Sequence, residues 1–147
     1  MAPKFHPTPL SGGDRKALAK ELARSQAMTR ILAEQSAQCR GQGEELIRKA
    51  DNLACQSWNE KMWSAGGPVD PSPTIGEALN GGYPWLEVQC SRCKTKRSID
   101  LAAIERPQGT FIHQLADALH CRKCRRTTKP RAILHQLTQT RYHAPDD

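Results

Sequence analysis

The feature that most constrains the fold of this chain is a doubled Cys-x-x-Cys motif. Cys90 and Cys93 form the first pair, and Cys121 and Cys124 follow after a gap of 27 residues. Such a turn places two thiolates at adjacent corners of one tetrahedron, so two turns supply the four ligands of a closed structural site. The gap exceeds the roughly 15–20 residues that are common, and a helix expected over 110–120 accounts for the surplus. The four cysteines therefore predict one structural zinc ion.

Paired cysteines also form redox couples, disulfides and iron sites. A thioredoxin-like couple needs a βαβ pattern, and neither pair lies in one. The chain has no apolar run long enough for a secretory signal or for a membrane span. We therefore expect a cytoplasmic protein, in which thiols stay reduced and disulfides are rare. Four thiolates also suit iron in a rubredoxin-like site, and the spacing leaves that alternative open.

The apolar content of the chain is low for its length. Its 147 residues are only 5% aromatic, and the mean hydropathy is −0.68. A module of around 60 residues is only marginally stabilised by burial, and such modules usually need a metal or a crosslink. A structural zinc ion, which contributes on the order of 10 kcal/mol, fits this need.

The N-terminal half is rich in helix-forming residues. The pattern predicts two helices, over 14–40 and 44–63, separated by a break or sharp bend at Gly41 and Gly43. Two hypotheses fit their apolar faces about equally: an antiparallel helical pair that buries them, or an arm that binds a partner or a second copy. The residues of the predicted partner-binding face are Leu18, Leu22, Ile31, Leu32, Leu46, Leu53, Trp58 and Met62.

These elements predict an α+β protein. We expect a disordered leader over 1–13, a helical arm of two helices over 14–64, a linker over 65–82, a zinc-ribbon-like domain over 83–142 and a disordered tail over 143–147. Within the domain, apolar and β-branched residues predict strands over 85–89, 94–101 and 126–141. Thr74 and Asp100 are expected to cap short helical turns, and Thr110 is expected to cap the helix over 110–120.

The segment from Pro73 to Leu134 resembles the zinc-ribbon proteins. It contains PTIGEALNGGYPWLEVQCSRC and LHCRKCRRTTKPRAIL, and it is similar to small uncharacterised bacterial proteins that share a W-L-x-V-x-C-x-x-C hairpin. The resemblance covers less than half of the chain. It implies a ribbon fold and a bound metal but no activity, because zinc ribbons serve many functions.

Positive charge is concentrated around the cysteines. The chain carries a net charge of +7, and residues 85–142 hold 12 basic and 4 acidic residues. A basic surface of this kind is expected to bind phosphates with little sequence preference. The alternative is a protein-interaction adaptor or inhibitor that docks through the helices. The residues of the predicted nucleic-acid surface are Arg92, Lys94, Lys96, Arg97, Arg122, Lys123, Arg125, Arg126, Lys129 and Arg131.

The sequence does not predict an enzyme. A metal with four cysteine ligands has no open position for water or substrate, and phosphate-binding and nucleophile motifs are missing. His113 and Asp117 are expected on a solvated helix face, and His120 at a helix end rather than on the metal. The two remaining cysteines, Cys39 and Cys55, are expected to be packing thiols.

Overall fold

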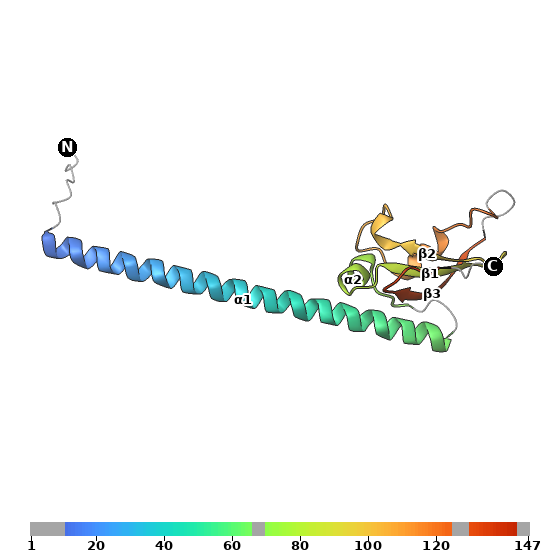
Figure 1. The fold of residues 1–147 in the computed structure, drawn as a ribbon, viewed down its shortest axis with the longest axis horizontal. Helices are drawn as coiled ribbons and strands as arrows, with labels where there is room; N and C mark the ends of the chain where they lie inside the picture. The colour runs from blue at the N-terminus through green and yellow to red at the C-terminus, as the bar shows by residue number, and fades with distance from the viewer. Residues whose placement is uncertain (1–10, 66–69, 125–129, 144–147) are drawn as a thin grey trace, which may run out of the picture. The chain divides into compact units, whose positions relative to one another are not determined.

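A computed structural model describes residues 11–65, 70–124 and 130–143 of the chain. The helices are α1 (Gly12–Ala65) and α2 (Ile75–Asn80), the strands are β1 (Trp85–Cys90), β2 (Lys96–Asp100) and β3 (Ala132–Thr138), and two 3-10 helices are η1 (Leu101–Ala103) and η2 (Ile112–Asp117) (Figure 1). This is an α+β structure, as predicted. The greater part of the predicted leader and tail lies outside the described residues.

Helix α1 is continuous over 54 residues, so the two predicted helices are one. The predicted break at Gly41 and Gly43 is wrong. A glycine costs a helix only about 1 kcal/mol relative to alanine, and the flanking residues here are strong helix formers with no proline among them. The hypothesis of an antiparallel helical pair is wrong for the same reason, since there is no turn between two helices.

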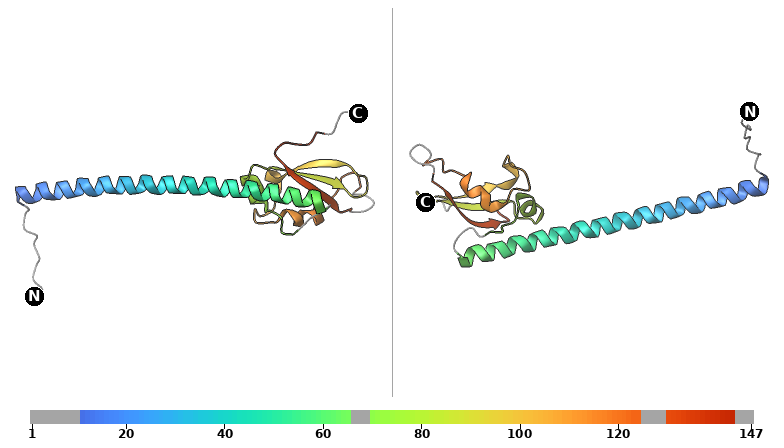
Figure 2. Two further views of the ribbon diagram at one scale, coloured as in Figure 1. Left: turned by 90° about the horizontal axis from the view of Figure 1, so that it is seen from below. Right: turned by 180° about the vertical axis from the view of Figure 1, so that it is seen from behind.

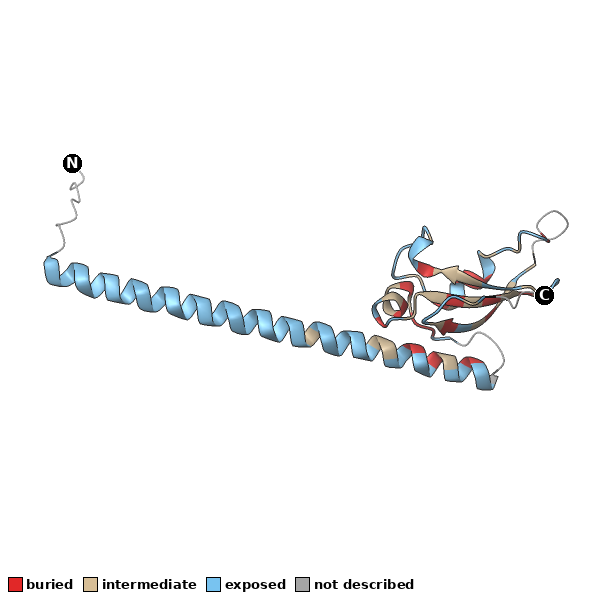
Figure 3. Cartoon of the chain, viewed as in Figure 1, coloured by how far each residue is buried: buried red, intermediate tan, exposed pale blue. Residues whose placement is uncertain are grey.

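Contacts divide the chain into two compact units, residues 1–44 and residues 45–147. The boundary falls inside the predicted helical arm, so the last part of α1 belongs to the second unit, which we call the sheet unit. Every residue from 11 to 42 is exposed, and the buried part of α1 lies beyond them (Figure 3). Trp58 and Met62 are only 2% and 5% exposed. Their predicted place on a partner-binding face is wrong, because they are buried in the core of their own unit.

The three strands form an antiparallel sheet in the order β2-β1-β3. Leu86 of β1 lies opposite Ile99 of β2 and Leu137 of β3. Alternate residues of β1 are buried, namely Leu86, Val88 and Cys90, because successive side chains of a strand point to opposite faces. The predicted strands are therefore confirmed, with β2 and β3 shorter than expected.

One hydrophobic cluster joins the sheet to the helices of the same unit. Trp58 of α1, Ile75 of α2, Leu101 of η1 and Ile112 of η2 are each no more than 2% exposed. The cluster as a whole consists of Cys55, Trp58, Met62, Ile75, Ala78, Leu86, Val88, Leu101, Ile112, Leu115, Ala116, Leu134 and Leu137. Helix α1 thus supplies the largest core side chain to a sheet that lies far from it in sequence.

The predicted caps at Thr74 and Asp100 are present. The side chain of Thr74 accepts a hydrogen bond from the Glu77 N–H at 3.1 Å, and that of Asp100 accepts one from the Ala102 N–H at 3.0 Å. The helix predicted over 110–120 is the shorter 3-10 helix η2, and its N-cap is Phe111, so the cap predicted at Thr110 is wrong. In the part of the chain that the structure describes, no helix combines the length and the apolar content that crossing a bilayer would require.

The edge strand β3 lies beside the last part of α1 (Figure 2), and Asn59 of α1 bonds to its backbone. The Asn59 side-chain amide donates to the Leu137 carbonyl at 2.9 Å and accepts from the Leu137 N–H at 2.8 Å. Replacing Asn59 by Ala is expected to lower the free energy of unfolding by about 2 kcal/mol, because both backbone groups of Leu137 lose their partner. Urea denaturation of the metal-loaded protein measures the change.

The matched control for this prediction is Gln56→Ala on the same helix. The Gln56 side chain is exposed, and among the described residues it bonds to Asn52 of the same helix, so we expect a change below about 0.5 kcal/mol. An Asn59→Ala variant as stable as this control would contradict the role given to Asn59.

Candidate metal centre

The first pair of cysteines lies at the turn between β1 and β2. The alternation of β1 brings Cys90 to the buried face of the sheet. The turn is closed by two backbone hydrogen bonds, from the Lys94 N–H to the Cys90 carbonyl (3.1 Å) and from the Cys90 N–H to the Thr95 carbonyl (3.0 Å). Lys94 has φ 60°, a left-handed conformation that lets the chain reverse within few residues. Cys93 lies in this turn and is exposed.

The second pair lies between η2 and β3. An isolated antiparallel bridge joins His120 to Arg131, which brings the segment with Cys121 and Cys124 next to the start of β3. Cys90 pairs with Ala132, the first residue of β3. Both pairs of cysteines are therefore held at the same end of the sheet, although they are far apart in sequence.

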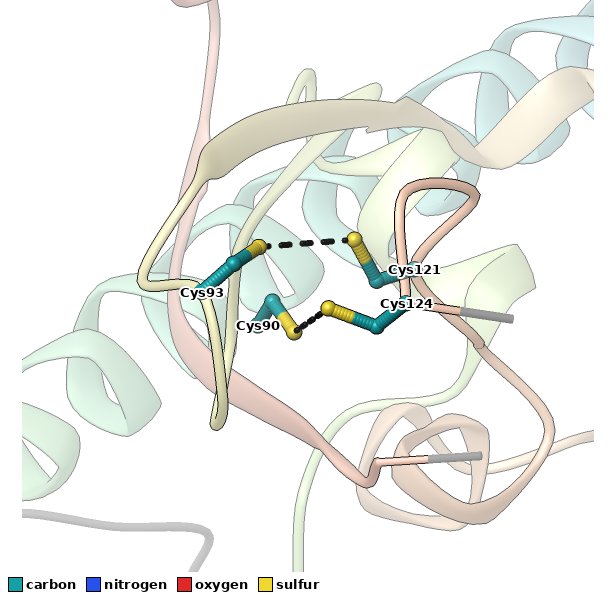
Figure 4. A group of neighbouring side chains, drawn as sticks. All are labelled: Cys90, Cys93, Cys121 and Cys124. Atoms are coloured by element: carbon teal, nitrogen blue, oxygen red, sulfur yellow. Dashed lines mark hydrogen bonds between the residues drawn. The ribbon is translucent and has the colours of Figure 1, made fainter. Parts of the chain in front are cut away.

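The four sulfur atoms form one cluster (Figure 4). All four Sγ atoms lie within 4.8 Å of one another, with 3.9 Å between Cys90 and Cys124 and 3.6 Å between Cys93 and Cys121. A tetrahedral ion with metal–sulfur bonds of about 2.3 Å requires sulfur–sulfur distances of about 3.8 Å, whereas a disulfide needs about 2.05 Å. The side chains therefore fit a single metal ion held by four thiolates, with two ligands from each Cys-x-x-Cys pair.

The surroundings of the sulfurs affect their ionisation differently. Hydrogen bonding with Thr95, whose Oγ1 lies 3.1 Å from the Cys93 sulfur, lowers the pKa of Cys93 to about 6. Burial raises the pKa of Cys124 to about 12. Because the thiolate is the metal ligand, the lowered pKa of Cys93 favours metal binding, whereas the raised pKa of Cys124 opposes formation of its thiolate in the absence of metal.

Comparisons of the chain with protein-family models, with curated proteins and with solved structures found no match. The resemblance to zinc ribbons accordingly rests on the spacing of the cysteines and on the geometry of their sulfurs. With four protein ligands on a tetrahedral ion, the site has the composition of a structural centre and no position for an exchangeable ligand.

The other residues considered as ligands or packing thiols are not members of the four-sulfur cluster. His120 is not part of this cluster of described residues. Cys55 is buried in the core, and burial raises its pKa to about 12, as expected of a packing thiol. Cys39 is exposed, so it does not pack within the described part of its own chain, contrary to the prediction.

His113 and Asp117 do not form a pair. His113 instead makes two contacts with Ser72. The Ser72 Oγ lies 2.7 Å from the ring Nδ1 of His113 and accepts a hydrogen bond from the His113 backbone N–H at 2.9 Å. Ser72 is 5% exposed, so this contact ties the segment before α2 to η2. Asp117 forms an ion pair with Arg131.

The described residues of the predicted nucleic-acid surface are all exposed. They are Arg92, Lys94, Lys96, Arg97, Arg122, Lys123 and Arg131. Three further predicted residues, Arg125, Arg126 and Lys129, lie outside the described part of the chain. The ion pair with Asp117 partly offsets the charge of Arg131, which therefore contributes less to the surface than the sequence suggests.

Two overlapping cavities lie beside the metal centre. One, of about 350 Å³, is lined by Cys90 and Cys121 together with three arginines, and the other has about 620 Å³. They share Thr95, Arg97, Ser98 and Arg141. None of the described residues that line either cavity is acidic. We call this surface the basic groove, defined by Lys96, Arg97, Arg122, Lys123 and Arg141.

Arg141 is the groove residue that sequence reasoning missed. It lies 17 residues beyond Cys124, and only the fold brings it back. The Tyr142 N–H donates to the Ser98 Oγ at 2.7 Å, which holds the segment after β3 beside β2. The Arg141 guanidinium lies 5.7 Å from the centroid of the Trp85 ring, within the range of a cation–π contact. No local motif marks this position.

Proposed function

We propose that this is a non-enzymatic protein that binds nucleic acid through the basic groove, with one structural zinc ion at the four cysteines. The observation that carries the proposal is the groove itself: five basic side chains from separate parts of the chain line two overlapping cavities whose described residues include no acid. Zinc is proposed over iron because four thiolates in a closed site are its common structural arrangement.

Neutralising the metal centre does not require this much positive charge. Four thiolates and one zinc dication carry a formal charge of −2, against an excess of eight basic residues over 85–142. The surplus supports an anionic partner. Arginine also matches phosphate better than lysine does, because its planar fork can donate two parallel hydrogen bonds, and three of the five groove residues are arginines.

Binding is proposed to rest on phosphates rather than on base stacking. Single-strand binding proteins stack bases on exposed aromatic rings. In the sheet unit Trp85 contacts Arg141, and Phe111 stacks on His113 with ring centroids 5.5 Å apart. The exposed Trp63 is not among the described residues that line the basic groove. A phosphate-directed surface predicts little sequence preference and a steep dependence on salt.

The alternative function is a protein adaptor or inhibitor that docks through the helical arm. With Trp58 and Met62 buried, six residues of that predicted face stay exposed, namely Leu18, Leu22, Ile31, Leu32, Leu46 and Leu53. Such binding would map to α1 and depend weakly on salt, which separates it from the groove.

Fluorescence anisotropy of the metal-loaded protein with mixed-sequence duplex DNA, single-stranded DNA and RNA tests the proposal. We expect binding that weakens steeply as salt rises, since bound cations displace counterions from phosphates. Changing Arg97 and Arg122 together to Gln is expected to weaken binding at least about tenfold and to lower the salt slope on duplex DNA by about 2.

The matched control changes Arg24 and Arg106 to Gln, which removes the same net charge outside the groove. Both side chains are exposed, and neither is among the described residues that line the cavities. Equal losses in the two double variants, or no binding by the unmodified protein at low salt, would overturn the proposal.

A further inference from the structure

Helix α1 exposes many large apolar side chains that no other described part of the chain covers. They are between 47% and 67% exposed: Leu18, Leu22, Met28, Ile31, Leu32, Leu46, Ile47 and Leu53. Most helical stability in proteins comes from packing of one face rather than from propensity. Every described residue over 11–42 is exposed, so packing within the described chain does not stabilise an apolar face on this part of the helix.

These side chains contain a regular seam. Starting at Leu18, steps of four and three residues alternate along α1 and mark the d and a positions of a heptad repeat in turn. These twelve seam positions are Leu18, Leu22, Ser25, Thr29, Leu32, Ser36, Cys39, Gly43, Leu46, Ala50, Leu53 and Ser57. None of them is charged. All 11 charged residues between 18 and 57 lie at other positions of the repeat.

The contacts within the sheet unit leave this seam open. There α1 packs on the core through Cys55, Trp58 and Met62, which are not seam positions. Leu46 and Leu53 belong to the seam and are 67% and 53% exposed. In this part of the helix one face is therefore used within the chain and a different one is free.

We propose that α1 pairs along this seam with α1 of a second copy, as a parallel, in-register two-stranded coiled coil. The positions that flank a seam decide whether like charges meet. In a parallel pair they face each other five residues apart, as Glu21 with Gln26, Gln35 with Arg40 and Lys49 with Ala54. None of these pairs holds two charges, so self-pairing meets no repulsion.

The distribution of leucine favours the parallel arrangement. In a parallel pair each seam residue meets its own equivalent, which gives five layers of Leu against Leu, at 18, 22, 32, 46 and 53. In an antiparallel pair each d residue faces an a residue, and the a positions after Leu22 are Thr, Ser, Gly, Ala and Ser. At most two Leu–Leu contacts then form in any register, so the parallel pair buries more apolar surface against apolar surface.

Sedimentation equilibrium on the full-length, metal-loaded and reduced protein tests the pairing without reference to nucleic acid. We expect a species of twice the 16.4 kDa chain mass at concentrations up to about 100 µM. Leu32→Glu, which sets two carboxylates against each other in one layer, is expected to raise the dimer dissociation constant at least about 100-fold.

The control is Ile31→Glu, which changes the adjacent residue in the same way outside the seam. Ile31 is 47% exposed, and its substitution is expected to leave the dissociation constant within about threefold of the unmodified value. A monomer at about 100 µM, or equal effects of the two substitutions, would overturn the proposal. Neither result bears on the basic groove, which belongs to the sheet unit.

Cys39 reports the orientation. It occupies a d position, so in a parallel pair two Cys39 residues share a layer, at a separation that a disulfide can span. Diamide, which takes up two hydrogen atoms as two thiols become one disulfide, is expected to give a covalent dimer that Cys39→Ser abolishes. Leu18→Cys in the Cys39→Ser background should restore it, since residue 18 meets its equivalent only in a parallel pair. A dimer that neither cysteine crosslinks would overturn the parallel arrangement.

Discussion

Replacing Cys124 by Ser, or removing the metal with a chelator, is expected to abolish the cooperative unfolding transition of the sheet unit. The four sulfurs link the β1–β2 turn to the segment before β3, and Cys124 is one of the two buried ligands. A structural zinc ion contributes on the order of 10 kcal/mol. The net stability of a domain is only about 5–15 kcal/mol, so losing the ion removes most of it.

Near-UV circular dichroism and thermal denaturation measure this loss, and elemental analysis counts the metal. We expect one ion per chain in the unmodified protein and none in Cys124→Ser. The matched control is Cys39→Ser, since Cys39 is exposed and outside the sulfur cluster, and it should keep both the metal and the transition. A Cys124→Ser variant that unfolds at the temperature of the unmodified protein would contradict a stabilising metal centre.

The metal centre could be predicted from the sequence because its signals are local. Each Cys-x-x-Cys turn fixes the positions of two sulfurs by itself, and the alternation of Leu86, Val88 and Cys90 identifies a strand and the face on which its cysteine lies. Caps behave in the same way: Thr74 bonds a backbone group three residues away. These local predictions were confirmed, whereas the cap predicted at Thr110 was not, because η2 begins after Phe111.

The fate of the helix could not be predicted from the sequence, because it depends on small differences and distant contacts. Gly41 and Gly43 reduce helix propensity by an amount that neighbouring residues can offset. The sequence pattern of α1 identifies apolar side chains but not the surface that each of them contacts. Trp58 was therefore assigned to a partner-binding face, whereas it packs in the core. The seam and the buried face share one helix, and only the contacts separate them.

The basic groove was predicted in part. The arginines next to the cysteines follow from the sequence, since residues beside a metal turn lie near the metal. Arg141 and the pairing of Arg131 with Asp117 do not, because both result from how segments far apart in the chain meet. One residue was thereby added to the predicted surface, and the charge of another was partly offset.

Trp58→Ala is expected to lower the free energy of unfolding of the sheet unit by about 3–5 kcal/mol. Trp58 is 2% exposed and is the largest of the fully buried side chains. Truncating a buried tryptophan removes its transfer free energy and leaves a cavity that the neighbours fill only partly. Urea denaturation followed by far-UV circular dichroism measures the change without relying on tryptophan fluorescence.

Trp63→Ala is the matched control, because it makes the same substitution on the same helix. Trp63 is 88% exposed, so we expect a change within about 0.5 kcal/mol. Since both substitutions replace Trp by Ala on one helix, the difference between them measures what the core loses with the Trp58 side chain. If Trp58 faced a partner instead, its truncation would leave the free energy of unfolding unchanged, as in the control. Equal stabilities of the two variants would therefore contradict the burial of Trp58 in the core and support a place for it on the partner-binding face.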